Sequence, residues 1–142
     1  MHGINESLEF VPVRIAVLIV SDTRTVETDT SGTLLANRIR SAGHEVADHR
    51  IVADDVTAIR GAVSAWIADP EVDVVISSGG TGLTGRDVTP EAVTPLFEKT
   101  IDGFSVIFHQ VSFQSVGLST LQSRAVAGLA GGTFIFCLPG SN

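Results

Sequence analysis

The sequence contains little cysteine and few basic side chains, and both shortages narrow the range of functions. Its one cysteine, Cys137, excludes an internal disulfide and leaves no spacing typical of a zinc site. The 9 lysine and arginine residues are scattered and the net charge is −7, so the basic patch of a nucleic-acid-binding protein is missing. An anionic ligand would therefore need backbone amides or a bound metal to neutralise much of its charge.

Long apolar runs and targeting segments are also missing. The apolar run Ile15–Val20 is far shorter than the roughly 20 residues that span a bilayer. Residues 1–12 are polar and do not resemble a signal peptide, so we expect a flexible N-terminal segment. Residues 13–142 have the length of one compact domain. We expect a cytoplasmic protein with neither a membrane nor a nucleic acid as its partner.

Alternating apolar and amphipathic segments predict an α/β fold. Strands are expected at Val13–Val20, Glu45–Val52 and Val72–Ser78, and helices at Gly32–Ala42, Thr57–Ala68, from Thr89 onward and at Phe104–Gln114. Residues Ala125–Ala130 and Thr133–Leu138 form either a hairpin through Gly131 and Gly132 or a loop that leads into a last strand. Because strands and helices alternate, we expect right-handed crossovers and a mostly parallel sheet with helices on both faces.

Two helix starts stand out in the sequence. Thr30 or Ser31 is expected to cap the first helix, and Gly43 suits the position after its end. Thr89 is expected to cap a later helix that begins with Pro90.

The expected fold brings four segments to one edge of the sheet. Ligands of parallel α/β sheets bind beyond the carboxyl ends of the strands. The segments that follow strands are 21–24, 54–55, 79–87 and 139–142. They are also rich in glycine and carboxylates, so we expect the functional site there.

The glycine-rich loop after the third strand is a candidate anion site. Gly79–Gly82 can present several backbone N–H groups, and nearby serine and threonine hydroxyls add donors. Residues 80–85 also match the dinucleotide-binding pattern G-x-G-x-x-G. We interpret this match as accidental, because residues 86–88 intervene before the next helix and the loop follows the third strand rather than the first. The plain alternative is an ordinary strand-to-helix turn.

Two carboxylates are candidates for metal binding. Asp54 and Asp87 follow different strands, so the fold can bring them to one cleft. A site that binds a triphosphate with few basic residues needs Mg²⁺, which prefers one or two carboxylates plus phosphate oxygens. Each aspartate also has a structural alternative: Asp54 or Asp55 as a helix cap, and Asp87 as a cap of its own loop.

The other polar candidates are open to two interpretations. The loop Pro139–Asn142 is either an anion loop or a simple turn, and Ser123-Arg124 provides either phosphate ligands or a surface salt bridge. We expect structural roles for His44, His49 and His109, and a place in the core for Cys137. No arrangement of residues supports a nucleophilic triad.

A set of motifs, taken in order, resembles one family. The motifs are Ser21-Asp22-Thr23-Arg24, Ser78-Gly79-Gly80-Thr81-Gly82, Arg86-Asp87-Val88-Thr89-Pro90-Glu91, Ser123-Arg124 and Leu138-Pro139-Gly140-Ser141. In this combination the chain resembles the MoaB/MogA family of molybdenum-cofactor biosynthesis proteins, which is related to the G domain of gephyrin. The resemblance extends from about Val13 to the end of the sequence. Family members normally continue past the Pro-Gly-Ser loop into a further helix, which this sequence does not contain.

The resemblance implies a three-layer α/β/α domain that binds molybdopterin and assembles as a homotrimer or homohexamer. It implies transfer of AMP from ATP to the terminal phosphate of molybdopterin, with Mg²⁺ as cofactor and pyrophosphate as product. By motif match, Asp54 and Asp87 are the implied catalytic and metal-binding residues. The implied substrate-binding residues are Ser21, Asp22, Gly79, Gly80, Thr81, Gly82, Ser123, Arg124, Pro139, Gly140 and Ser141.

Two other functions remain open at this point. The first is a non-catalytic protein that binds molybdopterin or serves as a scaffold. The second is a related domain that acts on other nucleotide derivatives, as in CinA-type proteins. The presence of both Asp54 and Asp87 favours the adenylyltransferase over the non-catalytic alternative.

Overall fold

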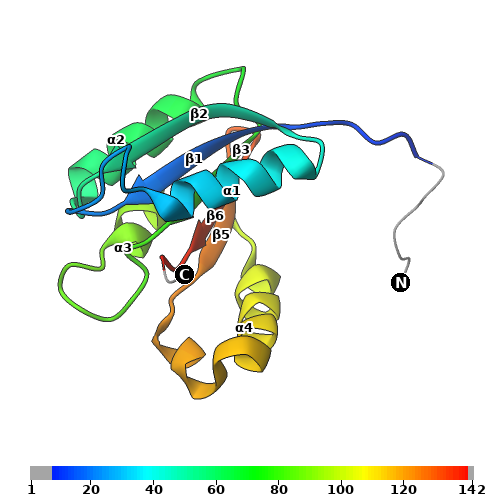
Figure 1. Cartoon of the computed structure of the whole chain (residues 1–142). Coiled ribbons are helices and arrows are strands. Elements are labelled where there is room, and N and C mark those ends of the chain that lie inside the picture. Colours follow the sequence, from blue (N-terminus) through cyan, green and yellow to red (C-terminus); the bar gives the residue numbers. More distant parts are fainter. Residues whose placement is uncertain (1–7, 141–142) are drawn as a thin grey trace.

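The computed structural model describes residues 8–140 and contains a six-stranded sheet with the strand order β2-β1-β3-β6-β5-β4 (Figure 1). The strands are β1 (Arg14–Val20), β2 (Glu45–Val52), β3 (Val74–Ser78), β4 (Lys99–Thr100), β5 (Val126–Ala130) and β6 (Thr133–Leu138). The helices are α1 (Thr30–Ser41), α2 (Val56–Ile67), α3 (Thr89–Val93) and α4 (Asp102–Val116), with 3₁₀ turns η1 (Thr94–Leu96) and η2 (Gly117–Gln122). Strands β1, β2, β3 and β6 are parallel, whereas β5 and β4 are antiparallel to their neighbours.

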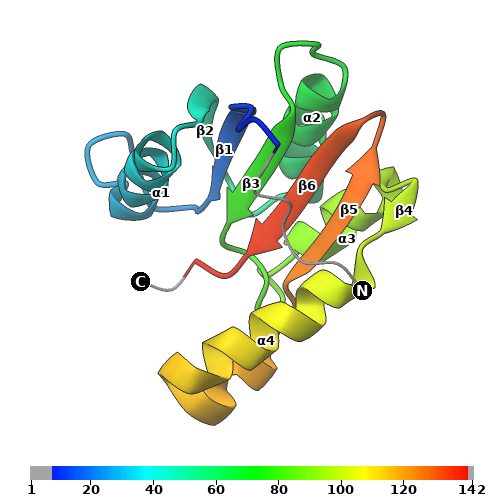
Figure 2. The same cartoon turned by 90° about the vertical axis from the view of Figure 1, so that its right-hand side faces the viewer.

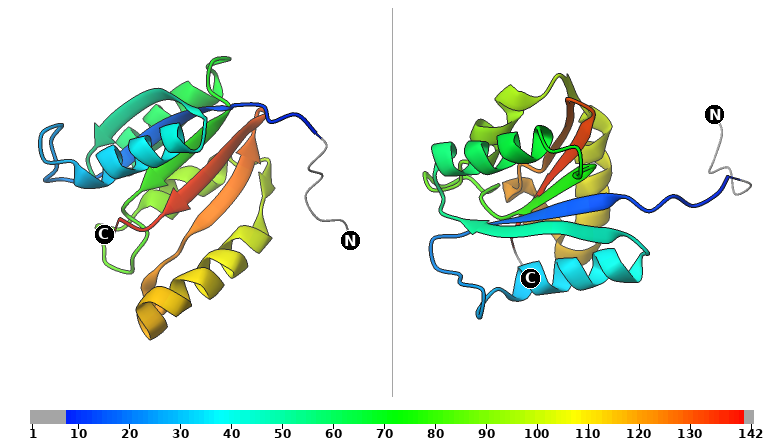
Figure 3. Two further views of the ribbon diagram at one scale, coloured as in Figure 1. Left: turned by 45° about the vertical axis from the view of Figure 1, so that its right-hand side comes forward. Right: turned by 90° about the horizontal axis from the view of Figure 1, so that it is seen from above.

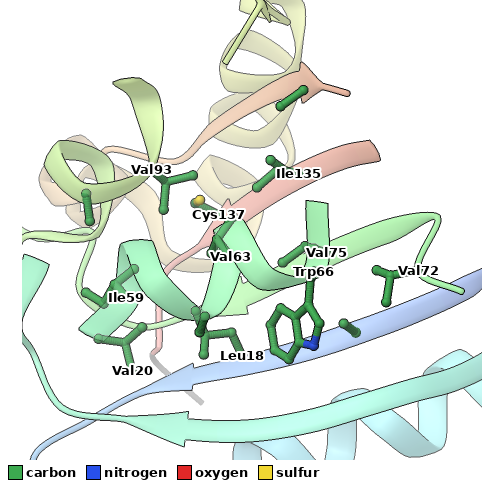
Figure 4. Packing of buried hydrophobic residues seen from close by; sticks show 14 residues of the cluster. Leu18, Val20, Ile59, Val63, Trp66, Val72, Val75, Val93, Ile135 and Cys137 are labelled. Atoms are coloured by element: carbon green, nitrogen blue, oxygen red, sulfur yellow. The ribbon is translucent and has the colours of Figure 1, made fainter. Parts of the chain in front are cut away.

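Strand β1 lies between β2 and β3 and is buried on both faces, as its apolar sequence predicts. Ala16, Leu18 and Val20 join the larger apolar cluster, which also contains Trp66 of α2 and Ile135 of β6 (Figure 4). The alternate residues of β1 form a second cluster with Ile39 of α1. Successive side chains of β1 therefore point to opposite faces of the sheet and contribute to both clusters.

Helices cover the two faces of the sheet and produce three layers (Figure 2, Figure 3). Helices α2 and α3 pack on the face of the larger cluster, and α1 packs on the opposite face. Helix α4 lies beside β5 and β6, and the ring centroids of Phe104 in α4 and Phe136 in β6 are 5.3 Å apart. The expected α/β/α architecture with a mostly parallel sheet is confirmed.

Both predicted N-cap residues are wrong, and each helix begins slightly earlier in the chain than predicted. Asp29, rather than Thr30 or Ser31, caps α1, because its carboxylate accepts the Gly32 backbone N–H at 2.7 Å. Thr89 already belongs to α3, and its hydroxyl donates to the carbonyl oxygen of Gly79 at 2.9 Å instead of capping the helix. Gly43 follows α1 with φ +88°, as predicted for this position.

Other element boundaries differ modestly from expectation. Strand β3 begins two residues later than Val72, which sits in a turn (its N–H donates to Asp69 O) although its side chain is buried in the core. Helix α4 extends beyond the predicted range at both ends. The hairpin between β5 and β6 is confirmed, and both residues of its turn, Gly131 and Gly132, have positive φ.

The N-terminal residues 8–12 form exposed chain without helix or strand, and residues 1–7 of the expected flexible segment lie outside the described residues. The flexibility of this segment stays a prediction. Within residues 8–140, none of the helices combines the length and the apolar character that crossing a membrane requires.

Candidate functional site

The loops after β1, β2, β3 and β6 meet at the carboxyl edge of the sheet. The Ser21 backbone N–H donates to Val52 O at 2.9 Å, and the Gly79 N–H donates to Leu138 O at 3.0 Å. These bonds join neighbouring strands at their last residues, because the four strands are parallel and end at the same edge. The loops that carry the predicted site segments therefore start at the same edge of the sheet, and Ser141 and Asn142 lie outside the described residues.

The glycine-rich loop after β3 needs glycine at two positions. Gly79 and Gly80 have φ +107° and +74°, a region that side chains with a Cβ rarely adopt. A Cβ at Gly79 would also collide with the carbonyl oxygen of Val20, and one at Gly80 with the Thr89 hydroxyl. The loop thus passes close to β1 and α3 while its backbone turns over the end of the sheet.

This loop forms one side of the main cavity, which has a volume of about 510 Å³. Predicted residues that line it are Gly79, Gly80, Thr81, Gly82, Asp87, Ser123, Pro139 and Gly140. Lining residues that sequence reasoning missed are Ser112, Val116, Ser119, Thr120 and Gln122 of α4 and η2. The only sequence signal for them is the short polar run around Thr120, which has no regular spacing.

A smaller cavity adjoins the main one at Gly79 and Gly140, which line both. Ser21 lines this second space, together with Arg24 and Asp29. The Ser21 hydroxyl accepts the backbone N–H groups of Thr23 and Arg24 at 3.2 and 3.1 Å, so it also shapes the loop after β1.

Asp22 connects the loop after β1 with Asp54 and Arg86. Its carboxylate accepts the Asp54 backbone N–H at 2.8 Å and pairs with the Arg86 guanidinium at 2.7 Å. The Arg86 guanidinium also lies 3.9 Å from the Asp54 carboxylate. Sequence reasoning gave Arg86 no role, although it stands in the Arg-Asp-Val-Thr-Pro-Glu motif.

The Asp54 carboxylate is held in an unfavourable electrostatic environment. Its side chain is 13% exposed. Burial raises the pKa of Asp54, and the negative charges of Asp22 and Asp87 raise it further, against a smaller opposing effect of Arg86. Because its neighbour Asp55 caps α2 through the Ala58 N–H at 2.8 Å, the capping alternative applies to Asp55 and leaves the Asp54 side chain available.

Asp87 lies in the cavity wall and is engaged with its own loop. Its carboxylate accepts the Thr84 hydroxyl at 2.7 Å and the Thr84 backbone N–H at 3.0 Å. The hydrogen bond from the Thr84 hydroxyl is the largest cause that lowers the pKa of Asp87. Asp87 is thus ionised and partly satisfied, which combines the loop-cap alternative with a position at the cavity.

Arg124, which lies just before the start of β5, holds the glycine-rich loop in place. Its guanidinium donates to Gly82 O at 2.8 Å and Asp87 O at 2.7 Å, and pairs with the Glu91 carboxylate. Its backbone N–H donates to Thr81 O at 2.8 Å. All of these partners belong to the protein, so Arg124 positions the glycine-rich loop, and its predicted contact with a phosphate stays a prediction.

The histidines and the cysteine have structural surroundings, as expected. His49 pairs with the buried Asp29 at 2.8 Å, and His109 bonds to the backbone oxygens of Ser105 and Ser123. His44 accepts the Val13 N–H at 3.0 Å. Cys137 is fully buried, and burial raises the pKa of its thiol to about 11.

Comparison with known proteins decides the family. The family model described as a probable molybdopterin binding domain matches residues 16–142. The chain belongs to the MoaB/MogA family of molybdopterin-binding proteins. It is 53% identical over 135 residues to molybdenum cofactor biosynthesis protein B of Escherichia coli (strain K12), a match that covers 95% of this chain and 79% of the relative.

Solved structures of family members have the same fold. A crystal structure of molybdenum cofactor biosynthesis protein B matches with a TM-score of 0.89 and 45% identity, over 92% of this chain and 82% of that chain. Tungsten cofactor synthesizing protein MoaB from Pyrococcus furiosus matches with a TM-score of 0.76 and 34% identity, over 92% and 83% of the two chains. The carboxyl-edge loops described above therefore belong to a domain of the MoaB type.

The donor set at this edge fits a magnesium ion that is shared with a ligand. Within residues 8–140, no group of three or more histidine, cysteine, aspartate or glutamate side chains is placed to hold a metal by itself. Asp54 and Asp87 are two carboxylates, and the negative charge of Asp87 acts on Asp54. Magnesium in proteins commonly uses one or two carboxylates together with substrate phosphates and water.

Proposed function

We propose that this cytoplasmic protein binds molybdopterin and ATP and transfers AMP to the terminal phosphate of molybdopterin. The observation that carries the proposal is the position of Asp54, a poorly solvated carboxylate close to the charges of Asp22 and Asp87. Mutual repulsion makes this arrangement costly for the protein alone. A cation bound together with the phosphates of a nucleotide would relieve this repulsion. The arrangement therefore suits a site for a metal and a nucleotide.

In the proposed reaction, an oxygen of the molybdopterin phosphate attacks the α-phosphorus of ATP. The bond from that phosphorus to the bridging oxygen breaks, and pyrophosphate leaves. Asp54 and Asp87 would hold Mg²⁺, which would supply positive charge next to the phosphate oxygens. The backbone N–H groups of Gly80 and Thr81 bind a phosphate, and Ser123 with Pro139 and Gly140 binds molybdopterin.

The chain's other residues act through these groups. Arg124 keeps the loop from Gly82 to Asp87 in place through two backbone carbonyls. Asp22 holds the turn that carries Asp54. Positioning of this kind accelerates a phosphoryl transfer because the reaction requires alignment of the attacking and leaving oxygens.

The direct test is pyrophosphate release from ATP and Mg²⁺ with and without molybdopterin. We expect release that depends on molybdopterin and on Mg²⁺. A folded protein that binds molybdopterin and releases no pyrophosphate would contradict the enzymatic proposal.

A second candidate is a molybdopterin-binding protein or scaffold without catalysis. The hydrogen bonds from Thr84 to Asp87 favour it, because a carboxylate that caps its own loop has a structural role without a metal. Under this alternative, molybdopterin binds but ATP and Mg²⁺ do not. Equilibrium binding of each ligand separates the two candidates.

We also propose that α4 and η2 form the contact between subunits of a homotrimer or homohexamer. No residue of α4 is buried, although Phe104 and Phe108 stack near Phe136. Large apolar side chains on these two elements are exposed by more than half: Val106, Ile107, Val111, Phe113, Val116, Leu118 and Leu121. An exposed apolar patch of this kind marks a protein interface in many proteins.

A further inference from the structure

The main cavity contains buried hydroxyl groups that no protein group binds. Thr81, Thr120 and Ser123 line the cavity, and their side-chain oxygens have no hydrogen-bond partner within residues 8–140. Thr81 is 2% exposed and Thr120 is 7% exposed. The one other orphan hydroxyl in that part of the chain, Ser77, lies next to Cys137 in the sheet and away from the cavity lining. Such groups are rare in folded proteins, and their gathering around one cavity requires an explanation.

The two sides of the cavity differ in chemistry. The side formed by Gly79–Gly82 offers the backbone N–H groups of Gly80 and Thr81 and lies beside the Asp87 carboxylate, which suits phosphate with a cation. The side formed by η2 has no charged side chain and carries Thr120 and Gln122, with Val116 of α4 as apolar surface. A hydroxyl and a carboxamide can each donate and accept hydrogen bonds. This side therefore suits a neutral, flat heterocycle with ring N–H and C=O groups.

We propose that η2 recognises the ring end of the ligand, and that the Thr120 hydroxyl is a specificity-determining group, assisted by Thr81. The inference rests on the proposed function, in which the ring is the pterin of molybdopterin, and it assigns the pterin to η2 and the phosphate to the glycine-rich loop. The orphan oxygens have less than 1 Å² of accessible surface in the free protein. Rotation about the threonine Cα–Cβ bond exchanges the methyl and hydroxyl branches, and this brings the oxygen to the ligand.

A buried hydroxyl that hydrogen-bonds only to a ligand can be recognised by how its substitution changes stability and affinity. Replacing it with a methyl group removes no hydrogen bond from the free protein, so stability is retained or increased. The same replacement leaves a polar group of the bound ligand without a partner, so affinity falls. A threonine with a purely structural role would lose stability and affinity together.

The test measures the Kd of molybdopterin and the melting temperature for the full chain and three variants. Thr120→Val should weaken binding roughly 10- to 100-fold while its melting temperature equals or exceeds that of the native protein. Thr120→Ser, which keeps the hydroxyl, should recover most of the affinity. Thr33→Val of α1 is the matched control, because Thr33 lies outside the cavity lining and its hydroxyl already donates to Asp29 O at 2.9 Å. It should leave the Kd within about threefold of the native value.

Other outcomes overturn specific statements. If Thr120→Val binds molybdopterin as tightly as the native chain, the inference is wrong and the proposed function stands. If Thr120→Val and Thr120→Ser weaken binding equally, or if both lower the melting temperature, Thr120 acts through packing and the inference is wrong. If the native chain does not bind molybdopterin, the proposed function itself fails and the inference fails with it.

Discussion

The Asp22 carboxylate accepts the backbone N–H of Asp54 at 2.8 Å and so ties the loop after β1 to the loop after β2. This contact keeps the Asp54 side chain, already largely buried, close to the negative charge of Asp22 itself. Arg86, with a side chain 67% exposed, lies near both carboxylates and partly offsets their charge in the free protein. The Asp22 and Asp54 carboxylates therefore repel each other at the position where the proposed metal and nucleotide bind.

Asparagine in place of Asp54 should stabilise the free protein at neutral pH. The pKa of Asp54 in the folded protein is raised above its ordinary value of 3.8, so the folded state favours the protonated carboxyl. The stability that the protonated carboxyl contributes is lost as the pH rises through this raised pKa. Asp54→Asn should increase the free energy of unfolding by about 0.5–1 kcal/mol near pH 7, measured by urea denaturation. The increase should shrink toward zero near pH 3, where the native carboxyl is protonated.

The neighbouring substitution Asp55→Asn is the control for this stability effect. Asp55 caps α2, and asparagine caps helices about as well as aspartate. Asp55→Asn should therefore change stability little at either pH. A loss of stability in Asp54→Asn near pH 7 would show that its attraction to Arg86 outweighs the repulsion and would refute the electrostatic account.

Lysine in place of Arg124 should destabilise the free protein. A single ammonium cannot reproduce the planar fork that reaches Gly82 O, Asp87 O and Glu91 together. Because the side chain is only partly buried, we expect a loss of roughly 1–2 kcal/mol in chemical denaturation without ligand. Unchanged stability combined with weaker binding of molybdopterin would instead assign Arg124 to the ligand.

Two helical glycines should respond to alanine in opposite directions. Gly32 in α1 sits against the Asp29–His49 pair, and a Cβ there would collide with both side chains. Gly61 in α2 has no atom within 4 Å of an added Cβ. Gly32→Ala should destabilise the protein by about 1–3 kcal/mol, whereas Gly61→Ala should stabilise it by about 0.5–1 kcal/mol, both measured by thermal denaturation. A neutral Gly32→Ala would mean that Asp29 and His49 can move apart freely.

Charge on the exposed face of α4 should weaken self-association. Ile107 is 59% exposed, and Ile107→Glu places a carboxylate in the proposed subunit contact. We expect a lower oligomer mass by light scattering, with an affinity loss of at least tenfold. Ala65→Glu adds the same charge to an exposed site of α2 and should leave the mass unchanged. A native chain that is already monomeric would contradict the proposed assembly.

The secondary structure was largely predictable, because β1 is almost wholly apolar and β2 has an alternating pattern of residues. The errors lie where several residues of one type compete locally. Asp29, Thr30 and Ser31 are all good helix caps, and the sequence does not reveal that His49 from β2 binds Asp29 and favours it. Strand β4 has two residues, too few to show any periodicity.

The candidate site was predictable as a set of loops but not as a set of contacts. Parallel strands bring their carboxyl ends together, which places Asp54 and Gly79 at the same edge. The contact between Asp22 and Asp54, the bracing by Arg124 and the wall formed by Thr120 depend on side-chain directions and on a 3₁₀ turn without sequence periodicity. Local patterns carry no information on contacts between residues so distant in the sequence.

The most direct measurement of the central claim is the rate of molybdopterin-dependent pyrophosphate release by the native chain, Asp54→Asn, Asp87→Asn and Asp55→Asn, with ATP and Mg²⁺ in excess. The account predicts release by the native chain, a rate lower by roughly 100-fold or more in Asp54→Asn and Asp87→Asn, and a rate within about twofold of native in Asp55→Asn. Equal rates in all four proteins, or no release by a native chain that binds molybdopterin, would contradict it.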